Sequence, residues 1–248
     1  MASQRVLVTG AAGRIGAAFV SAHAQHYQFR LADRVLPPGA EHDPRWMRLD
    51  ITDAVACEAA CVDIDTVLHL AGDASTLADF QSSLLDNNIV GTYNIFTAAA
   101  KQRCQRVIFA SSIQTVAGYP FTKQVQPESP HRPVTMYGVS KCFGEAVASY
   151  FAATHDLSCI VIRIGNYAET PPASTWSAHG LSSYLSVRDC HQLFRRCIET
   201  PNIPFAVVHG LSANRFPRLN LDETTALLGY VPQDDSFAFL QLHDNDPW

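Results

Sequence analysis

Residues 5–16 read RVLVTGAAGRIG and place three evenly spaced glycines directly after a short apolar run. The apolar part, Arg5–Thr9, is rich in valine and leucine, which predicts a buried β-strand. The glycines lead at once into an amphipathic stretch, so the run is typical of a strand, a tight turn and a helix in succession. This unit predicts an α/β fold.

Short apolar runs and longer amphipathic runs alternate along the next 150 residues. The runs with the composition of strands are Gln28–Ala32, Thr66–Leu70, Arg106–Ala110 and Ser158–Ile164. The runs with helical periodicity are Ile15–His26, Ala54–Cys61, Asn87–Lys101 and Tyr137–His155. Strands that alternate with helices form parallel sheets covered on both faces, so we expect a doubly wound α/β fold of the Rossmann type.

The glycine loop has the features of a phosphate-binding turn. Glycines let the backbone approach a pyrophosphate closely, and the N-terminus of the following helix offers free N–H groups and a partial positive charge. We therefore expect a dinucleotide cofactor there. The expected contacts are Gly10, Ala12, Gly13, Arg14, Ile15 and Gly16.

A carboxylate at the end of the second expected strand indicates which dinucleotide is bound. Asp33 lies about 20 residues after the loop, where a carboxylate accepts hydrogen bonds from the ribose hydroxyls and repels a ribose phosphate. NAD is therefore favoured over NADP, although the adjacent Arg34 can soften the preference by pairing with a phosphate. Further along the chain, the expected cofactor contacts are Asp50, Ile51, Leu70, Ala71, Gly72 and Ile164.

Tyr137 and Lys141 stand four residues apart at the start of an expected helix, so their side chains share one face. A neighbouring ammonium favours the tyrosine phenolate, which can then exchange a proton with a substrate hydroxyl. Ser112, after the strand Arg106–Ala110, is placed to hold the same oxygen. Tyr137 and Lys141 are also expected to contact the cofactor. Asn88 is expected either to contact the cofactor or to tie its helix to the neighbouring strands.

The sequence is organised as one structural domain with two parts. Residues 1–165 are expected to form the dinucleotide-binding core, and residues 166–248 a small substrate-binding lobe packed on it. The lobe contains a Pro/Ser-rich segment, Thr170–Ser183, followed by an expected helix, Val187–Thr200, and an expected strand, Phe205–His209.

Composition argues against several classes of protein. The 248 residues carry a net charge of -5 with no basic stripe, so nucleic acid is not expected as a partner. No apolar stretch approaches the roughly 20 residues of a membrane span, and no signal peptide is recognised, which favours a cytoplasmic protein. The seven cysteines include no CxxC pair, so no metal site is expected.

These motifs together resemble the extended short-chain dehydrogenases of the NAD-dependent epimerase/dehydratase family. The resemblance is carried by TGAAGRIG (9–16), LAD (31–33), HLAG (69–72), NNIVGTYN (87–94), FASS (109–112) and YGVSK (137–141). Within that family the chain is similar to uronate dehydrogenases through YGVSKCFGE (137–145), VIRIG (161–165) and GLSANRF (210–216). The resemblance implies oxidation of the anomeric carbon of a hexuronic acid to a lactone, with NAD.

The resemblance also assigns residues. It implies a catalytic triad of Ser112, Tyr137 and Lys141, and it makes Ser75, Ser111 and Asn166 sugar contacts. Thr170–Leu185 lacks the arginine with which uronate dehydrogenases hold the substrate carboxylate, so His179 is the nearest cationic replacement. Ile113 and Gln114 are the two positions after the triad serine, where the family shows polar residues, and Gln114 is expected to face the sugar. A hexuronic acid and a neutral aldose are both expected substrates.

Other functions remain open at this level. A nucleotide-sugar epimerase or dehydratase shares the triad, but such enzymes usually carry a larger C-terminal lobe. A non-catalytic NAD-binding sensor shares the fold, but such proteins typically lack the tyrosine or the lysine. The apolar faces of Asn87–Lys101 and Tyr137–His155 also predict a homodimer or a higher homo-oligomer.

Overall fold

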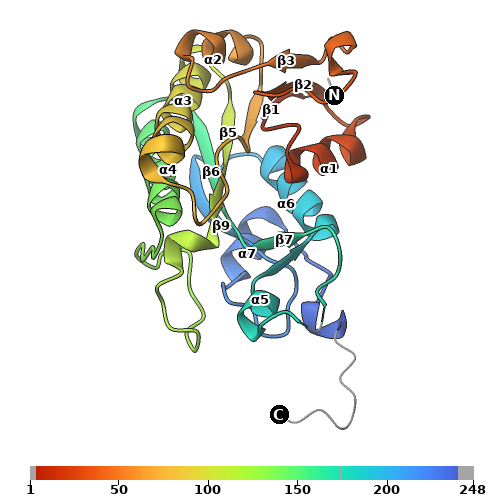
Figure 1. Cartoon of the computed structure of the whole chain (residues 1–248), viewed down its shortest axis with the longest axis vertical. Coiled ribbons are helices and arrows are strands. Elements are labelled where there is room, and N and C mark those ends of the chain that lie inside the picture. The colour runs from red at the N-terminus through yellow and green to blue at the C-terminus, as the bar shows by residue number, and fades with distance from the viewer. Residues whose placement is uncertain (1–3, 174, 240–248) are drawn as a thin grey trace.

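The computed structural model describes residues 4–173 and 175–239, which build a seven-stranded parallel sheet in the order β3-β2-β1-β4-β5-β6-β9 (Figure 1). The strands are β1 (Arg5–Thr9), β2 (Gln28–Asp33), β3 (Trp46–Arg48), β4 (Thr66–His69), β5 (Arg106–Ser112), β6 (Ser158–Ile164) and β9 (Phe205–Gly210). The expected doubly wound fold is confirmed.

Helices cover both faces of this sheet. One face is packed by α2 (Ala54–Cys61), α3 (Gly91–Lys101) and α4 (Met136–Thr154), and the other by α1 (Arg14–His23) and α6 (Val187–Glu199) (Figure 1). Successive residues of β1 show how the alternation of a strand divides the core: Val6 and Val8 pack with α1 and α6, whereas Leu7 packs with α2 and α3.

The strand order reverses at β1: β2 and β3 follow one another on one side of β1, and β4, β5, β6 and β9 on the other. β1 pairs with β2 on one side and with β4 on the other, and Thr9 lies opposite His69 at the ends of β1 and β4. The loops that follow these two strands therefore leave the sheet side by side and diverge. In open α/β sheets this switch point is where ligands bind.

Part of the region after Gly165 belongs to the main sheet and not to a separate lobe. β9 pairs with β6, and α6 lies on the α1 side of the sheet. A two-stranded sheet of β7 (Asn166–Ala168) and β8 (Tyr184–Ser186), with α5 (Ala178–Ser182), lies at the lower end of the molecule in Figure 1. α7 (Asp222–Leu228) follows β9, and residues 240–248 of the expected lobe lie outside the described residues.

The expected helix Asn87–Lys101 begins earlier in the structure. A π-helical segment, Phe80–Val90, precedes α3, and the side chain of Asp79 caps its first turn by accepting a hydrogen bond from Ser82 N. Across residues 4–173 and 175–239, no helix combines the length and apolar character needed to cross a membrane.

The contact between α4 and β5 generates a stability prediction. A Cβ on Gly144 would overlap the buried ring of Phe109, with Cζ and Cε1 as the nearest atoms. Gly→Ala inside a helix normally stabilises by about 1 kcal/mol, but overpacking costs about 1–3 kcal/mol. We therefore expect Gly144→Ala to lower the free energy of unfolding, measured by urea denaturation, by about 1–2 kcal/mol.

The matched control is Ser149→Ala, an exposed position on the same helix. Because no packed ring faces it, this variant should be as stable as the wild type or slightly more stable. If Gly144→Ala were as stable as Ser149→Ala, the close contact between α4 and β5 would be contradicted.

Candidate active site

The loop after β1 passes so close to the loop after β4 that no side chain fits between them. Gly10 has a φ of +72°, and a Cβ there would lie 2.8 Å from Ala71 N. A Cβ on Gly16 would lie 2.5 Å from the carbonyl oxygen of Gly10. α1 then begins with no side-chain hydrogen bond at its N-cap, Gly13, so its first N–H groups are free for an anion. This cradle fits a dinucleotide pyrophosphate.

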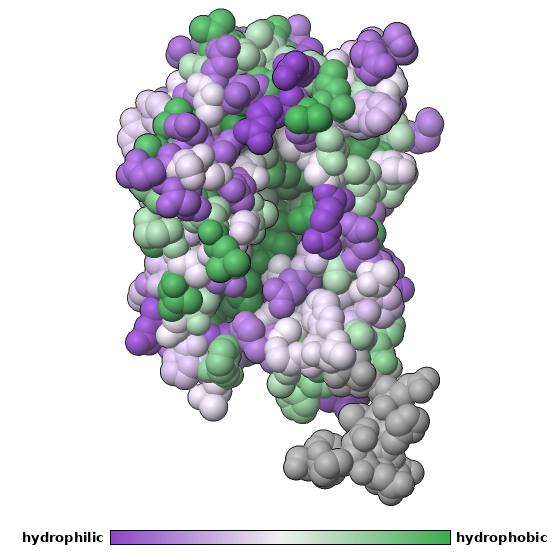
Figure 2. Space-filling view, in the orientation of Figure 1, coloured by the Kyte–Doolittle hydropathy of each residue, from purple (hydrophilic) through white to green (hydrophobic). Residues whose placement is uncertain are grey.

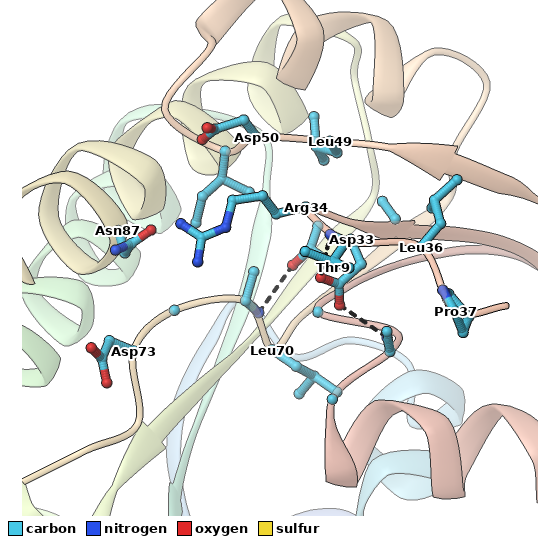
Figure 3. Close-up of a pocket in the computed structure, with 18 of the residues that line it drawn as sticks. Thr9, Asp33, Arg34, Leu36, Pro37, Leu49, Asp50, Leu70, Asp73 and Asn87 are labelled. Carbon is cyan, nitrogen blue, oxygen red and sulfur yellow. Dashed lines mark hydrogen bonds between the residues drawn. The ribbon is translucent and has the colours of Figure 1, made fainter. Parts of the chain in front are cut away.

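A cavity of about 640 Å³ extends from this cradle over the ends of β1, β2 and β4 (Figure 3). The expected cofactor contacts that line it are Gly10, Ala12, Gly13, Asp33, Arg34, Asp50, Ile51, Leu70, Ala71 and Gly72. Asp33 is held in place because its Oδ2 accepts a hydrogen bond from Ala12 N at 3.0 Å. An oriented carboxylate at this position suits the hydroxyls of an adenosine ribose.

Arg34 enters the same cavity from the strand end. In Figure 3 its guanidinium reaches toward Asn87, with Asp50 above it. Hydrogen bonds from the backbone and hydroxyl of Thr52, together with the charge of Arg34, lower the pKa of Asp50. Asn87 also lines the cavity and was not expected from the sequence.

A second cavity, of about 400 Å³, contains the expected triad. It shares Gly10, Gly13, Leu70, Gly72 and Asp73 with the first cavity, so the two form one continuous cleft. Figure 2 shows a long hollow down the middle of this face, apolar at its floor and hydrophilic along its rim. The other expected residues that line the second cavity are Arg14, Ile15, Gly16, Ser111, Ser112, Gln114, Tyr137, Lys141, Ile164 and Asn166.

The first turns of α4 present Tyr137 and Lys141 to this cavity. Thr135 caps the helix by accepting a hydrogen bond from Gly138 N at 3.0 Å. Lys141 Nζ lies 5.7 Å from the centre of the Tyr137 ring, and both side chains are buried. Burial raises the pKa of Tyr137, while a hydrogen bond with Ser112 opposes that rise. Burial also lowers the pKa of Lys141 to about 8.

One helical turn beyond Lys141, a buried carboxylate ties α4 to the sheet. Glu145 accepts hydrogen bonds from Arg163 Nη2 at 2.8 Å and Ser111 Oγ at 2.5 Å, and lies 2.8 Å from His131 Nε2. Burial raises the pKa of Glu145, but the hydrogen bonds from His131 and Arg163 outweigh it and lower the pKa to about 2. The hydroxyl of Ser111, expected to contact sugar, is thus committed to this carboxylate.

The sequence contained a signal for this network. Glu145 follows Tyr137 and Lys141 at helical spacing, and Arg163 is the one charged residue in the apolar run of β6. An unpaired buried charge is costly. A lone carboxylate on a buried helix face and a lone guanidinium in a buried strand are therefore expected to form an ion pair.

Three expected residues do not line either cavity. Asn88 is buried, and its side chain bonds both backbone groups of Asp73 and the hydroxyl of Ser140. Of the two roles expected for Asn88, these bonds support the structural one, in which it holds the loop after β4. The hydroxyl of Ser75 accepts a hydrogen bond from Leu77 N within the same loop. His179 lines a different cavity, which shares no described lining residue with the cavity of the triad.

Comparison with known proteins agrees with this geometry. The model of the NAD dependent epimerase/dehydratase family matches residues 6–177. An NAD-dependent glucose-6-phosphate dehydrogenase of Haloferax volcanii is 36% identical, over 95% of this chain and 95% of its own length. A uronate dehydrogenase of Pseudomonas putida is 32% identical, over 98% of this chain and 89% of its own.

Solved structures show the same relationship. The crystal structure of a glucuronic acid dehydrogenase from Chromohalobacter salexigens superposes with a TM-score of 0.87 at 35% sequence identity. The match covers 98% of this chain and 91% of that chain. Because the family model spans well over half of the sequence and these relatives span nearly all of it, the chain belongs to the NAD dependent epimerase/dehydratase family.

Proposed function

We propose that this chain is an NAD-dependent sugar dehydrogenase that oxidises the C1 hydroxyl of an aldose or a hexuronic acid to a lactone. The observation that carries the proposal is that Ser112, Tyr137 and Lys141 line one cavity that continues into the glycine cradle. The relatives of matching length are named as dehydrogenases of glucose 6-phosphate and of uronates, which supports a sugar as substrate.

The side chains of the second cavity can move the proton that such an oxidation releases. Bound NAD supplies the hydride acceptor. Ser112 can donate a hydrogen bond that orients the substrate oxygen, and Tyr137 can accept the proton from that oxygen. The ammonium of Lys141, with a pKa of about 8, is largely charged at neutral pH and favours the phenolate against the effect of burial.

The general test is the formation of NADH with a panel of sugars. We expect turnover with uronates or aldoses that carry a free C1 hydroxyl. Conversion of a nucleotide sugar without accumulation of NADH would instead favour an epimerase, and no reaction with any sugar would favour a protein that only binds NAD.

Replacement of the proposed base gives the first specific prediction. Tyr137→Phe removes the phenolic hydroxyl and keeps the ring, so kcat should fall by about 10²–10⁴-fold while the Kd for NAD changes little. The matched control is Tyr150→Phe, an exposed tyrosine on the same helix, which should keep full activity. Steady-state kinetics and calorimetric NAD titration check both. Retained turnover in Tyr137→Phe would contradict the assignment of the base.

The second prediction concerns the ribose carboxylate. Asp33→Ala removes the charge that repels a ribose phosphate while leaving Arg34 in place, so the ratio of kcat/KM with NAD to kcat/KM with NADP should fall by about tenfold or more. Asp156→Ala, at an exposed aspartate outside the cleft, is the control. An unchanged ratio in Asp33→Ala would show that another group discriminates between NAD and NADP.

A further inference from the structure

A third cavity, of about 480 Å³, lies between the loop that contains Phe121 and Lys123 and the segment Arg215–Arg218, with α5 beside it. We call it the basic cavity. Its described lining includes Lys123, His179, Arg215 and Arg218 and no aspartate or glutamate. In a chain with a net charge of -5, such a grouping raises the local positive potential and favours an anion at this place.

The charges of the basic cavity are poorly compensated by the protein. Arg218 is buried, and within the described part of the chain its guanidinium donates to the backbone carbonyls of Tyr119, Pro120 and Lys123 and to no carboxylate. Burial lowers the pKa of Arg218, but an arginine remains charged at neutral pH.

The two exposed cations are also available to a ligand. Among the described residues Lys123 has no carboxylate partner, and its ammonium lies 4.8 Å from the centre of the Tyr119 ring. Arg215 Nε lies 3.9 Å from Asp235 Oδ2, at the outer limit of an ion pair, and its side chain is 61% exposed. A pair of that geometry is worth little, so Arg215 can turn to a ligand at small cost.

His179 lines the basic cavity as a neutral hydrogen-bonding group. Its ring lies 4.7 Å from that of Phe121, and burial together with the charge of Arg218 lowers its pKa. A neutral imidazole adds a hydrogen-bonding group without adding to the repulsion among the three cations.

The basic cavity and the second cavity, which contains the triad, both border the backbone of residues 182–183. Asn166, which lines the second cavity, donates its N–H to the carbonyl of Ser183 at 2.7 Å. Arg218, which lines the basic cavity, donates its N–H to the carbonyl of the preceding residue, Ser182, at 2.8 Å. The two cavities therefore lie beside the same two residues of the chain, one next to Ser183 and the other next to Ser182.

We propose that the basic cavity binds the phosphate of a phosphorylated aldose whose C1 hydroxyl lies beside Tyr137. The inference rests on the proposed function and names the class of substrate. A phosphate carries nearly two negative charges and three acceptor oxygens, so it can use cations that approach from separate segments, as Lys123 and Arg215 do.

A phosphate uses this cavity more fully than a carboxylate. A carboxylate is satisfied by the paired N–H groups of one guanidinium, which here can only be that of Arg215 because Arg218 is already bonded to three carbonyls, and Lys123 is then left unused. This arrangement also accounts for the absence of an arginine from Thr170–Leu185, because the cations come from other segments of the chain.

Three hexoses that differ only at C6 test the inference. Glucose carries a hydroxymethyl group there, glucuronate a carboxylate, and glucose 6-phosphate a phosphate ester. With NAD, we expect kcat/KM for glucose 6-phosphate to exceed that for each of the other two by at least about tenfold. Lys123→Gln and Arg215→Gln should each lower that preference by about tenfold, mainly through KM. Lys101→Gln, at an exposed lysine paired with Glu58, is the control and should leave the preference unchanged.

A binding measurement separates this inference from the proposed function. With saturating NAD occupying the cradle, inorganic phosphate should raise the midpoint of thermal unfolding of the wild type, and the double variant Lys123→Gln/Arg215→Gln should lose that rise. The same NAD-saturated variant without phosphate shows whether the fold is intact.

Each outcome is decisive. A higher kcat/KM for glucuronate or glucose, or a preference that the variants leave unchanged, would overturn the phosphate site while supporting the sugar dehydrogenase. No NADH with any of the three hexoses would count against the proposed function instead. In that case a phosphate-induced rise in the midpoint that depends on Lys123 and Arg215 would still support the anion site, and no rise would overturn it.

Discussion

The buried ion pair between Glu145 and Arg163 is the interaction on which the catalytic geometry depends. Both side chains are only 3% exposed, and the pair joins α4 to β6 at the level of the cleft. Removal of one partner from such a pair costs about 3–5 kcal/mol, because the other charge is left buried and alone. Since Tyr137 and Lys141 occupy the preceding turns of the same helix face, the pair sets where the proposed base and its ammonium lie relative to the strand ends.

The second constraint is the close approach of the loops after β1 and β4. With no room for a Cβ at Gly10, the two loops define one cleft that runs from the ribose carboxylate of Asp33 to Tyr137. One end of that cleft has the features of a dinucleotide site, and the other end contains Ser112, Tyr137 and Lys141. Cofactor and reacting carbon can therefore lie next to each other in the same cleft.

The parts of this arrangement that could be predicted from sequence are those set by local spacing. The glycine loop, Asp33 and the pair Tyr137 and Lys141 lie within single strand–turn–helix units, where period and turn chemistry determine which side chains face the cleft. The hydrogen-bond partners of the Asn88 side chain, and the cavity that His179 lines, depend instead on contacts between segments distant in the chain. Likewise, the return of β9 to the main sheet follows from tertiary pairing with β6, which a local pattern of apolar residues does not specify.

NMR identification of the sugar formed when the protein, NAD and a reactive aldose or uronate are incubated together distinguishes oxidation at C1 from epimerisation. Oxidation at C1 with the triad in this cleft predicts a lactone, or the open acid formed by its hydrolysis, in a one-to-one ratio with NADH. A sugar inverted at another carbon, with no NADH accumulated, would exclude the proposed dehydrogenase and assign the site to an epimerase.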